Sequence, residues 1–406
     1  MTGNRNDDFC RRVGVTSVSN SLWGVVGAPR YPEVAEVGYG TIVSKGRAEG
    51  ESMISDELVQ LLTPEGERIP HPEYGSELGR DEIFGFYRDM VIVRRLCNES
   101  TSLQRQGQLA LWAPLQGQEA AQIGAGRALA PMDFSFPSYR EHGVAWTRGV
   151  PPRDMLRIFR ATTSGGWDPQ QYRHSVPMVV LGDQTLHAVG YAMGIQRDGA
   201  EEAVMTFFGD GASSQGDVLE SFVWAASFNA PVVFVLQNNQ WAISEPTSLQ
   251  TKIPLYHRAH GFGFPGVRVD GNDVLAMYEV AKRALDNARA GGGPTLIEAY
   301  TYRMGAHTTS DDPTRYRVDA EVEVWRHRDP IERVKALLAR EFGVHKVTFD
   351  EVAAEAEQLA LQLREDVLAM DAPDPTTMFD NVYAEPHALV EAGRREMIEL
   401  GIGGGH

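Results

Sequence analysis

The chain has 406 residues, of which 42% are hydrophobic, and it carries 55 acidic against 38 basic residues. This length and composition indicate a globular protein with one large domain or two modest ones. The formal net charge of -17 argues against a general nucleic-acid-binding protein, which needs a basic face. Because no run of about 18 apolar residues occurs, the sequence predicts no membrane span.

The N-terminal part of the chain is polar and has weak periodicity. Its first twenty residues lack the apolar segment of a signal peptide. The mixture of Gly, Ser, Asn and charged residues over 1–55 predicts an extension that is partly disordered. The two cysteines, Cys10 and Cys97, define no disulfide framework and favour reduced thiols. We therefore expect a cytoplasmic protein whose main domain spans 56–406.

Regular structure is predicted from the start of this main domain. Residues 58–68 favour an extended arm that ends in a Pro-Glu-Gly turn. From Asp81 onward apolar residues recur at helical spacing, and Gly107 is a suitable end for that helix. We expect the arm and the helix to lead into the central part of the domain.

The middle of the chain predicts a strand–helix–strand unit. Its parts are a buried strand, a helix and a second buried strand, at 203–208, 218–228 and 232–236. Ser213 and Ser214, ahead of the helix, favour a helix start. A unit of this length predicts parallel strands joined by a right-handed crossover.

The pattern continues toward the C-terminus. A strand and turn over 266–273 are followed by an amphipathic helix over 273–290 and another buried strand over 295–300. Such alternation predicts an α/β fold with a doubly wound, mostly parallel sheet flanked by helices. After Asp329 the chain is helical and charged, which predicts peripheral helices.

Two polar residues mark the carboxyl ends of the central strands, where doubly wound sheets bind ligands. Asp210 follows the first strand and Asn239 follows the second. Carboxylate and amide oxygens are hard ligands of the type that Mg²⁺ accepts. Gly209 and Gly211 let backbone N–H groups approach a phosphate, and the helix that follows points its positive end at the same place. The sequence therefore predicts a diphosphate held through a metal ion.

The spacing of these residues carries a family resemblance. Twenty-six residues separate the Gly-Asp-Gly of 209–211 from the Asn-Asn of 238–239, as in the thiamine diphosphate motif. The segment 209–244 resembles the α subunits of branched-chain 2-oxo acid and pyruvate dehydrogenases. Three further segments do so in the same order, at 109–129, 136–144 and 301–317. The resemblance covers about 81–329 and implies a thiamine diphosphate-binding fold.

The resemblance assigns a metal and phosphate site to five residues. Asp210 and Asn239 would ligate Mg²⁺ through their side chains, and Trp241 through its backbone carbonyl. Tyr139 and Arg140 correspond to the pair that reaches the diphosphate. Arginine suits this role because its planar fork matches phosphate oxygens.

Further cofactor contacts follow from the same alignment. Leu181 falls where the family packs an apolar side chain against the aminopyrimidine ring, and plain core packing is its alternative role. Gly209, Gly211 and Ala212 would offer backbone contacts to phosphate, and Ile243 would touch the cofactor.

The resemblance also places a catalytic histidine, His307, in the segment 301–317. It would bond near the cofactor phosphate and assist acyl transfer to lipoamide, because its pKa near neutrality lets it donate and accept protons. Arg303 would bind phosphate or anchor the loop. The residues expected to order the loop are Asp311, Asp312, Arg315 and Tyr316. We hypothesise that this loop is mobile without cofactor.

Two positions depart from the family pattern. Gln237 stands where the animal branched-chain relatives have an arginine, which puts that arginine's phosphate contact in doubt. Val179 and Val180 replace a serine-rich turn, so no potassium site is predicted there.

The chain holds one recognisable cofactor domain, for the diphosphate end of thiamine diphosphate. In the family the glutamate that contacts the aminopyrimidine belongs to another subunit. We therefore predict an α₂β₂ heterotetramer with a β subunit, and acyl transfer to a lipoyl-bearing dihydrolipoyl acyltransferase. The expected reaction is oxidative decarboxylation of a branched-chain 2-oxo acid of the 3-methyl-2-oxobutanoate type. Pyruvate is the first alternative substrate and acetoin the second.

Two other classes of protein compete with this interpretation. A Mg²⁺-dependent phosphohydrolase would usually supply several carboxylates, and only Asp210 stands at the predicted edge. A non-catalytic scaffold would not need the set of Asp210, Asn239, Arg140 and His307 intact. Binding of thiamine diphosphate with Mg²⁺ separates the enzyme subunit from both.

Overall fold

The computed structural model describes residues 58–75, 78–163 and 165–401, so the extension predicted over 1–55 lies outside the described residues. All elements below belong to the compact unit Asp56–His406. No helix in the described part of the chain combines the length and the apolar character needed to cross a bilayer.

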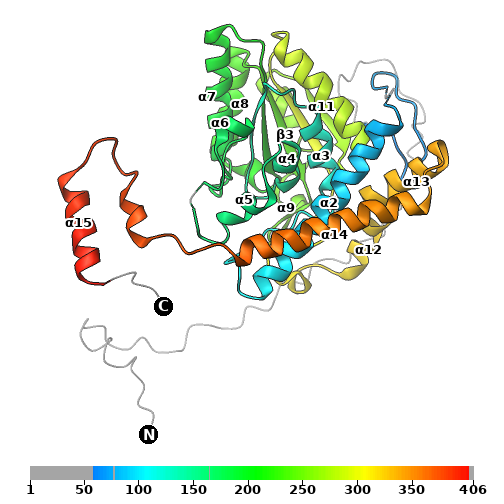
Figure 1. Cartoon of the computed structure of the whole chain (residues 1–406). Coiled ribbons are helices and arrows are strands. Elements are labelled where there is room, and N and C mark those ends of the chain that lie inside the picture. Colours follow the sequence, from blue (N-terminus) through cyan, green and yellow to red (C-terminus); the bar gives the residue numbers. More distant parts are fainter. Residues whose placement is uncertain (1–57, 76–77, 164, 402–406) are drawn as a thin grey trace, which may run out of the picture. The chain divides into compact units, whose positions relative to one another are not determined.

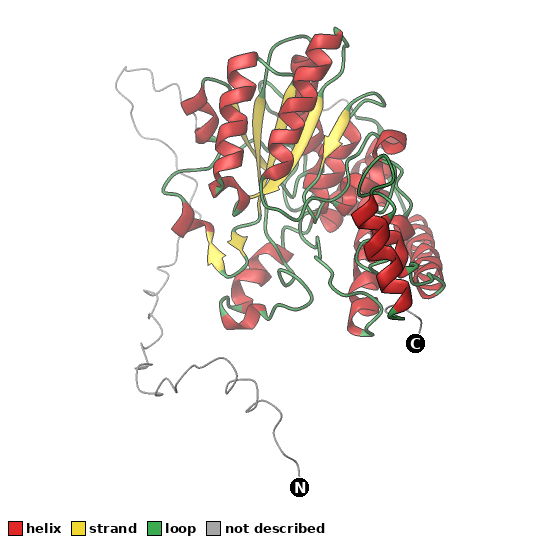
Figure 2. Cartoon of the chain, turned by 90° about the vertical axis from the view of Figure 1, so that its left-hand side faces the viewer, coloured by secondary structure: helices red, strands yellow, loops and turns green. Residues whose placement is uncertain are grey.

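The centre of the unit is a five-stranded sheet in which every pairing is parallel (Figure 2). In spatial order its strands are β1 (Phe134–Phe136), β2 (Val204–Gly209), β3 (Val232–Asn238), β7 (Thr295–Tyr300) and β6 (Gly266–Asp270). This confirms the predicted α/β class with its parallel sheet. Gly209 pairs with Gln237, so β2 and β3 end together at one edge of the sheet.

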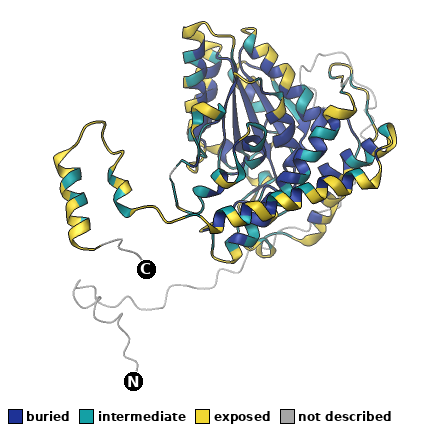
Figure 3. Ribbon diagram, viewed as in Figure 1, coloured by how far each residue is buried: buried dark blue, intermediate teal, exposed yellow. Residues whose placement is uncertain are grey.

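Helices cover both faces of this sheet (Figure 1). One face carries α2 (Arg80–Arg105), α3 (Glu119–Ala128) and α11 (Val274–Arg289), and the other carries α7 (Asp183–Asp198), α8 (Gly216–Phe228) and α10 (His257–Phe262). Side chains alternate along a strand, so Met205 and Phe207 enter one core while Val204 and Phe208 enter the other. Strands β1, β2, β3 and β7 are therefore buried along almost their whole length, as Figure 3 shows, whereas the edge strand β6 is only partly buried.

The remaining elements lie along the chain between the strands of this sheet and after them. Between the strands lie α4 (His142–Thr147), α5 (Pro152–Arg157), α6 (Pro169–Tyr172), η1 (Ala212–Ser214), β4 (Trp241–Ala242), β5 (Glu245–Pro246) and α9 (Thr247–Gln250). After β7 follow η2 (Pro313–Arg315), α12 (Asp319–Arg326), α13 (Pro330–Phe342), α14 (Lys346–Leu368), η3 (Pro375–Phe379) and α15 (Ala388–Glu399). Helix α14 packs on α2, where the Tyr87 and Phe349 rings meet at 5.0 Å.

The N-terminal arm is extended, as predicted. Val59 pairs with Val269 of β6, and Leu62 forms an antiparallel bridge to Arg68. Asp273, which caps α11, also accepts the backbone N–H groups of Leu61 at 2.7 Å and Leu62 at 2.6 Å. One buried carboxylate thus joins the arm to the start of a core helix.

Two local expectations differ from the structure. Ser213 and Ser214 do not start α8, which begins at Gly216, but lie in the short helix η1. The Ser213 hydroxyl and N–H both donate to the carbonyl of Asp210, at 2.5 and 3.2 Å, and this closes a tight turn ahead of the helix. Strand β1 was not predicted, because three residues are too short for an apolar pattern.

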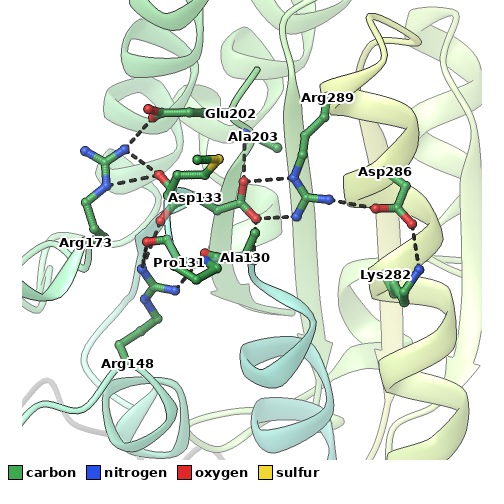
Figure 4. A network of polar contacts seen from close by, with 11 residues as sticks. Ala130, Pro131, Asp133, Arg148, Arg173, Glu202, Ala203, Lys282, Asp286 and Arg289 are labelled. Atoms are coloured by element: carbon green, nitrogen blue, oxygen red, sulfur yellow. Dashed lines mark hydrogen bonds and ion pairs between the residues drawn. The ribbon is translucent and has the colours of Figure 1, made fainter. Parts of the chain in front are cut away.

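The amino edge of the sheet is held by a buried ionic network (Figure 4). Asp133, just before β1, accepts the N–H groups of Ala130 at 2.7 Å and Ala203 at 3.0 Å, and Arg289 Nε at 3.0 Å. Arg148 donates to the carbonyls of Ala130 and Asp133, both at 3.1 Å. Since β1 and β2 begin here, this network lies at the edge opposite Asp210.

Candidate active site

A cavity of about 540 Å³ opens at the carboxyl ends of β2 and β3. Twelve residues are expected from the sequence to bind the cofactor or the metal or to act in catalysis. Eleven of them line this cavity: Tyr139, Arg140, Leu181, Gly209, Asp210, Gly211, Ala212, Asn239, Trp241, Ile243 and His307. The twelfth, Arg303, does not line it. The apolar part of the wall includes Leu111, Ala113 and Phe159. Residues from distant parts of the chain therefore converge on one volume.

Asp210 is almost completely buried at the base of this cavity. Thr247 Oγ1 and Gln250 Nε2 donate to its Oδ2 at 3.1 and 3.2 Å, and neither of these bonds uses Oδ1. Burial raises the pKa of the Asp210 carboxyl to about 6, and the two hydrogen bonds oppose that rise. A cation at Oδ1 would favour the charged form. Thr247 and Gln250 were missed from the sequence because only tertiary structure brings α9 to this carboxylate.

Asn239 faces the same volume from the end of β3. Its Nδ2 donates to Gln118 Oε1 at 3.1 Å, and its Oδ1 accepts the backbone N–H of Trp241 at 3.3 Å. These bonds fix which end of the amide is oxygen. Asn239 Oδ1 and the Trp241 carbonyl are therefore held in the segment that follows β3.

Arg303 is fully buried behind that segment. It donates to the carbonyl of Trp241 at 2.8 Å, to the carbonyl of Ile243 at 2.7 Å and to the Tyr316 hydroxyl at 2.8 Å. Of its two expected roles, these contacts match loop anchoring rather than phosphate binding. Burial lowers the pKa of Arg303 to about 10, which leaves it charged at neutral pH.

The anchored segment has a strained backbone. Gln240 and Ile243 have φ values of +70° and +58°. The left-handed region is unfavourable for a β-branched residue such as Ile243. The two hydrogen bonds from Arg303 hold the carbonyls of this segment in place, which is how the conformation persists.

Arg140 and His307 are in direct contact. Arg140 Nη2 lies 3.2 Å from His307 Nδ1 and 2.9 Å from the His307 carbonyl, and Nη1 donates to the Pro114 carbonyl at 2.6 Å. The Tyr139 ring meets the His307 ring edge to face at 6.0 Å. Burial first, then the charges of Arg140 and Arg303, lower the pKa of His307 to about 4. His307 is therefore neutral at physiological pH.

The protonation pattern of His307 follows from its neighbour. A guanidinium can only donate, so Nδ1 of His307 must accept. A neutral imidazole with an accepting Nδ1 carries its proton on Nε2. Nε2 is thus the atom that can give a proton to a ligand in the cavity.

A carboxylate and an arginine bond to the loop around His307. Asp311 Oδ2 accepts the His307 N–H at 2.8 Å and the Tyr316 hydroxyl at 2.5 Å. Arg317 donates to the carbonyls of Met304 at 2.8 Å and Gly305 at 2.9 Å. Asp311 and Tyr316 thus make the contacts expected of loop-ordering residues.

Two other residues expected to order this loop differ in their contacts. Asp312 caps η2, where its Oδ1 accepts the N–H of Thr314 at 3.1 Å and the hydroxyl of Thr314 at 2.7 Å. Arg315 is exposed, and Arg317, two residues on, supplies the arginine contacts. The sequence pattern placed an arginine in the loop but could not distinguish these two.

Gln237, the position that departs from the animal relatives, is buried at the cavity wall, and both ends of its amide are bonded within the chain. Its Nε2 donates to Glu141 Oε1 at 2.5 Å, and its Oε1 accepts Gln122 Nε2 at 3.1 Å. Gln122 also donates to the Arg140 carbonyl at 3.0 Å, and Ser138 donates to Glu141 Oε2 at 2.7 Å. Burial raises the pKa of the Glu141 carboxyl. This network supports the backbone of Arg140 through the hydrogen bond from Gln122 to its carbonyl.

The remaining predicted positions shape the wall. Leu181 is 43% exposed in the chain and lines the cavity, so it is not an ordinary core residue. A Cβ on Gly211 would lie 2.7 Å from the Ala242 Cβ, whereas one on Gly209 would meet open space. Packing therefore requires glycine at 211, and at 209 the backbone is accessible.

No cluster of three or more His, Cys, Asp or Glu suited to a metal occurs among the described residues. A metal here would rely on one carboxylate, one amide oxygen and a backbone carbonyl, together with oxygens of its ligand. This donor set is that of a metal–diphosphate site rather than of a multi-carboxylate hydrolase.

The fold and this cavity define an α/β protein with a candidate ligand site at the carboxyl edge of a parallel sheet. The chain belongs to the dehydrogenase E1 component family, which matches it over residues 87–366. This confirms the resemblance seen in the four sequence segments. Members of the family are oxidoreductases that decarboxylate 2-oxo acids and depend on thiamine diphosphate.

Three relatives illustrate the similarity. The 3-methyl-2-oxobutanoate dehydrogenase subunit alpha of Mycobacterium tuberculosis (strain ATCC 25618 / H37Rv) is 46% identical over 355 residues, covering 86% of this chain and 96% of that protein. The pyruvate dehydrogenase E1 component subunit alpha of Staphylococcus aureus (strain MW2) is 39% identical over 284 residues, covering 70% and 76%. Its counterpart in Staphylococcus epidermidis is 35% identical over 344 residues, covering 84% and 93%. Their names as alpha subunits imply a β subunit as partner.

Proposed function

We propose that this chain is the cytoplasmic α subunit of a branched-chain 2-oxo acid dehydrogenase, which binds thiamine diphosphate and Mg²⁺ in the cavity at the carboxyl edge of β2 and β3. The observation that carries this proposal is the convergence of eleven motif residues on one cavity. The expected substrate is a 2-oxo acid of the 3-methyl-2-oxobutanoate type. The acyl group would pass to the lipoyl group of a dihydrolipoyl acyltransferase.

The residues present fit the cofactor. Asp210, Asn239 and the Trp241 carbonyl supply oxygen ligands of the kind that Mg²⁺ takes, leaving further positions for phosphate and water. Arg140 offers donors to a phosphate, and the backbone at Gly209 is open to one. The volume of the cavity lies within the usual range for small-molecule sites, and its wall is partly apolar.

The bound cofactor would supply the carbanion and the electron sink for decarboxylation. The chain's own residues would hold the cofactor and donate a proton. Asp210 and Asn239 would keep the metal at the strand ends, while Arg140 and Tyr139 would orient the diphosphate. His307 would donate from Nε2 to an oxygen in the cavity, because its Nδ1 is occupied by Arg140. The apolar wall at Leu111, Leu181 and Phe159 would exclude water.

A second subunit completes this site in our proposal. Three carboxylates line the cavity: Asp210, Glu141 and Glu245. Asp210 is assigned to the metal, and Glu141 is engaged by Gln237 and Ser138. Glu245 is exposed at the rim. A β subunit that supplies the aminopyrimidine carboxylate, in an α₂β₂ heterotetramer, fits this arrangement.

The choice of 2-oxo acid is supported by similarity. The relative named for 3-methyl-2-oxobutanoate is 46% identical and covers more of the chain than the Staphylococcus aureus relative named for pyruvate, which is 39% identical. Pyruvate is therefore the second candidate, and acetoin the third. A phosphohydrolase is disfavoured because the described residues hold no cluster of three or more carboxylate, histidine or cysteine side chains suited to a metal.

Co-expression with the β subunit and assay on a substrate panel tests the proposal. The panel contains pyruvate and the oxo acids derived from valine, leucine and isoleucine. We expect the highest kcat/KM with a branched-chain oxo acid and no 2-oxo acid decarboxylation by the purified chain alone. Full activity of the chain alone would overturn the subunit assignment. A preference for pyruvate would overturn the substrate assignment.

A further inference from the structure

Gln118 carries an unpaired hydrogen-bond donor at the wall of the cavity. It is 1% exposed and its Nε2 has no hydrogen-bond partner in the described part of the chain. Its Oε1 is occupied, because it accepts Asn239 Nδ2 at 3.1 Å. Buried donors without a partner are rare and destabilising, so each one requires an explanation. Here a ligand in the cavity would be the missing partner.

The identity of the atom restricts the ligand. An amide N–H donates and cannot bind a cation, so Gln118 Nε2 needs an acceptor such as an anionic oxygen. The other buried atom without a partner on this wall, Gln184 Oε1, is an acceptor and would not serve an anion. Of these two unpaired atoms in the described part of the chain, the Gln118 amide nitrogen is the one that can donate to an anion.

Gln118 is held rigidly in this position. It caps the N-terminus of α3, and its carbonyl accepts the N–H of Gln122 one turn later at 3.2 Å. The preceding Gly117 has a φ of +96°, and a Cβ there would lie 2.3 Å from the Tyr302 carbonyl. The following Glu119 is buried and bonded to Arg94 at 2.7 Å. The Gln118 side chain thus extends from a backbone position that its neighbours hold in place.

Residues at the start of α3 contact both Asn239, a proposed metal ligand, and Arg140, a proposed phosphate-binding residue. Gln118 and Gln122 are four residues apart and share a helix face. Gln118 binds Asn239, on the metal side, and Gln122 binds the Arg140 carbonyl, on the phosphate side. A ligand oxygen that accepts from Gln118 Nε2 would therefore lie next to Asn239, which is a proposed ligand of the metal.

We propose that Gln118 is a cofactor-binding residue that donates from Nε2 to an oxygen of the metal-bound diphosphate while its Oε1 orients Asn239. This inference rests on the proposed function. A glutamate at this position would still accept from Asn239, but it would lack the donor and place a negative charge beside the diphosphate. The neutral amide supplies both functions at any physiological pH.

The test uses the chain purified with its β subunit and freed of cofactor. Affinity for thiamine diphosphate with Mg²⁺ is measured by quenching of tryptophan fluorescence in the native protein and in the Gln118→Met, Gln118→Glu and Gln362→Met variants. Gln362 is an exposed glutamine of α14 whose side chain donates to Asp366, and it is the matched control. We expect Gln118→Met and Gln118→Glu to raise Kd by about 10- to 100-fold, as for a lost bond to a charged group. Gln362→Met should bind normally.

Two further measurements separate the possible outcomes. KM for the 2-oxo acid at saturating cofactor should not change in the Gln118 variants. An unchanged cofactor Kd with a raised KM would show that Nε2 binds the substrate carboxylate, and would overturn the diphosphate assignment. A wild-type Kd in Gln118→Glu, with the circular dichroism of the native fold, would overturn the donor role. Normal cofactor binding by Asp210→Ala would instead indicate failure of the proposed function.

Discussion

Arg303 donates a hydrogen bond of 2.8 Å to the backbone carbonyl of Trp241, the carbonyl that the family resemblance assigns to the metal. A carbonyl has two lone pairs and can accept this bond while it ligates a cation. Together with the bond to Ile243, it fixes the strained segment that follows β3. Arg303 therefore holds two backbone carbonyls of the cavity wall in place, although it does not itself line the cavity.

Replacing Arg303 should release this segment and the loop beyond it. Arg303→Met loses three hydrogen bonds, and Arg303→Lys cannot restore them because an ammonium lacks the planar fork. We expect both variants to lower thiamine diphosphate affinity by about 10- to 100-fold, the effect of removing a support of ligating groups. Limited proteolysis gives a second readout. Cleavage near Thr308 should fall when cofactor and Mg²⁺ bind the native protein, and this protection should be lost in Arg303→Met.

Equal protection of Arg303→Met and the native protein would contradict that role for Arg303. Cleavage near Thr308 that cofactor and Mg²⁺ leave unchanged in the native protein would refute the hypothesis that the loop is mobile without cofactor.

Glu141 should matter as an acceptor rather than as a charge. Its two oxygens accept from Gln237 and Ser138, and burial raises the pKa of this carboxyl. Glu141→Ala leaves the Gln237 amide buried and unpaired, which should lower the free energy of unfolding by about 1–3 kcal/mol and weaken cofactor binding. Glu141→Gln keeps an acceptor for Gln237 and should retain most of both. Denaturant titrations and cofactor binding on the two variants measure this difference; equal losses would argue for a role of the charge.

His307 should make the folded chain more sensitive to acid. Its folded-state pKa of about 4 lies below the ordinary value of 6.5, so the unfolded chain binds the proton first as pH falls. The resulting loss of stability begins near pH 6.5 and is complete below pH 4. The variant His307→Asn cannot titrate, so its Tm should fall less than that of the native protein between pH 7 and pH 5. A parallel fall in the two proteins would mean that His307 titrates normally.

Asp133 should contribute to stability and not to ligand binding. Its carboxylate is buried and accepts two backbone N–H groups and Arg289 (Figure 4). Asp133→Ala leaves the N–H groups of Ala130 and Ala203 without their acceptor, while Arg289 keeps Asp286, and this should lower the free energy of unfolding by about 2–6 kcal/mol. The network lies at the opposite edge of the sheet from Asp210, so the folded variant should bind cofactor normally. Thermal unfolding and cofactor titration on one preparation check both halves of this prediction.

The central strands and most of the cavity followed from the sequence for a physical reason. Strands β2, β3 and β7 are buried on both faces, so each appears as a continuous apolar run. The carboxyl ends of parallel neighbours meet at one edge, which brought Asp210 and Asn239 together without further information. The helix start near Ser213 was wrong because a local turn to the Asp210 carbonyl competes with the helix.

The supporting residues could not be predicted in the same way. Gln118, Gln122 and Glu141 are polar residues whose burial depends on the packing of α3 against a loop far away in the sequence. Their only sequence signal is that they lie inside two of the family-like segments. The contacts of Arg303 likewise depend on where the chain after β3 turns, which no periodicity encodes.

The central claim is that Asp210 holds a metal that binds thiamine diphosphate. Titration calorimetry of the chain with its β subunit, native and as Asp210→Ala, tests this claim most directly when cofactor is added with and without Mg²⁺. We predict tight binding to the native protein only with Mg²⁺, and a loss of at least about 100-fold in affinity in Asp210→Ala, since removal of a ligand should exceed the effect of removing its support. Equal, Mg²⁺-dependent affinity in the two proteins would contradict the claim.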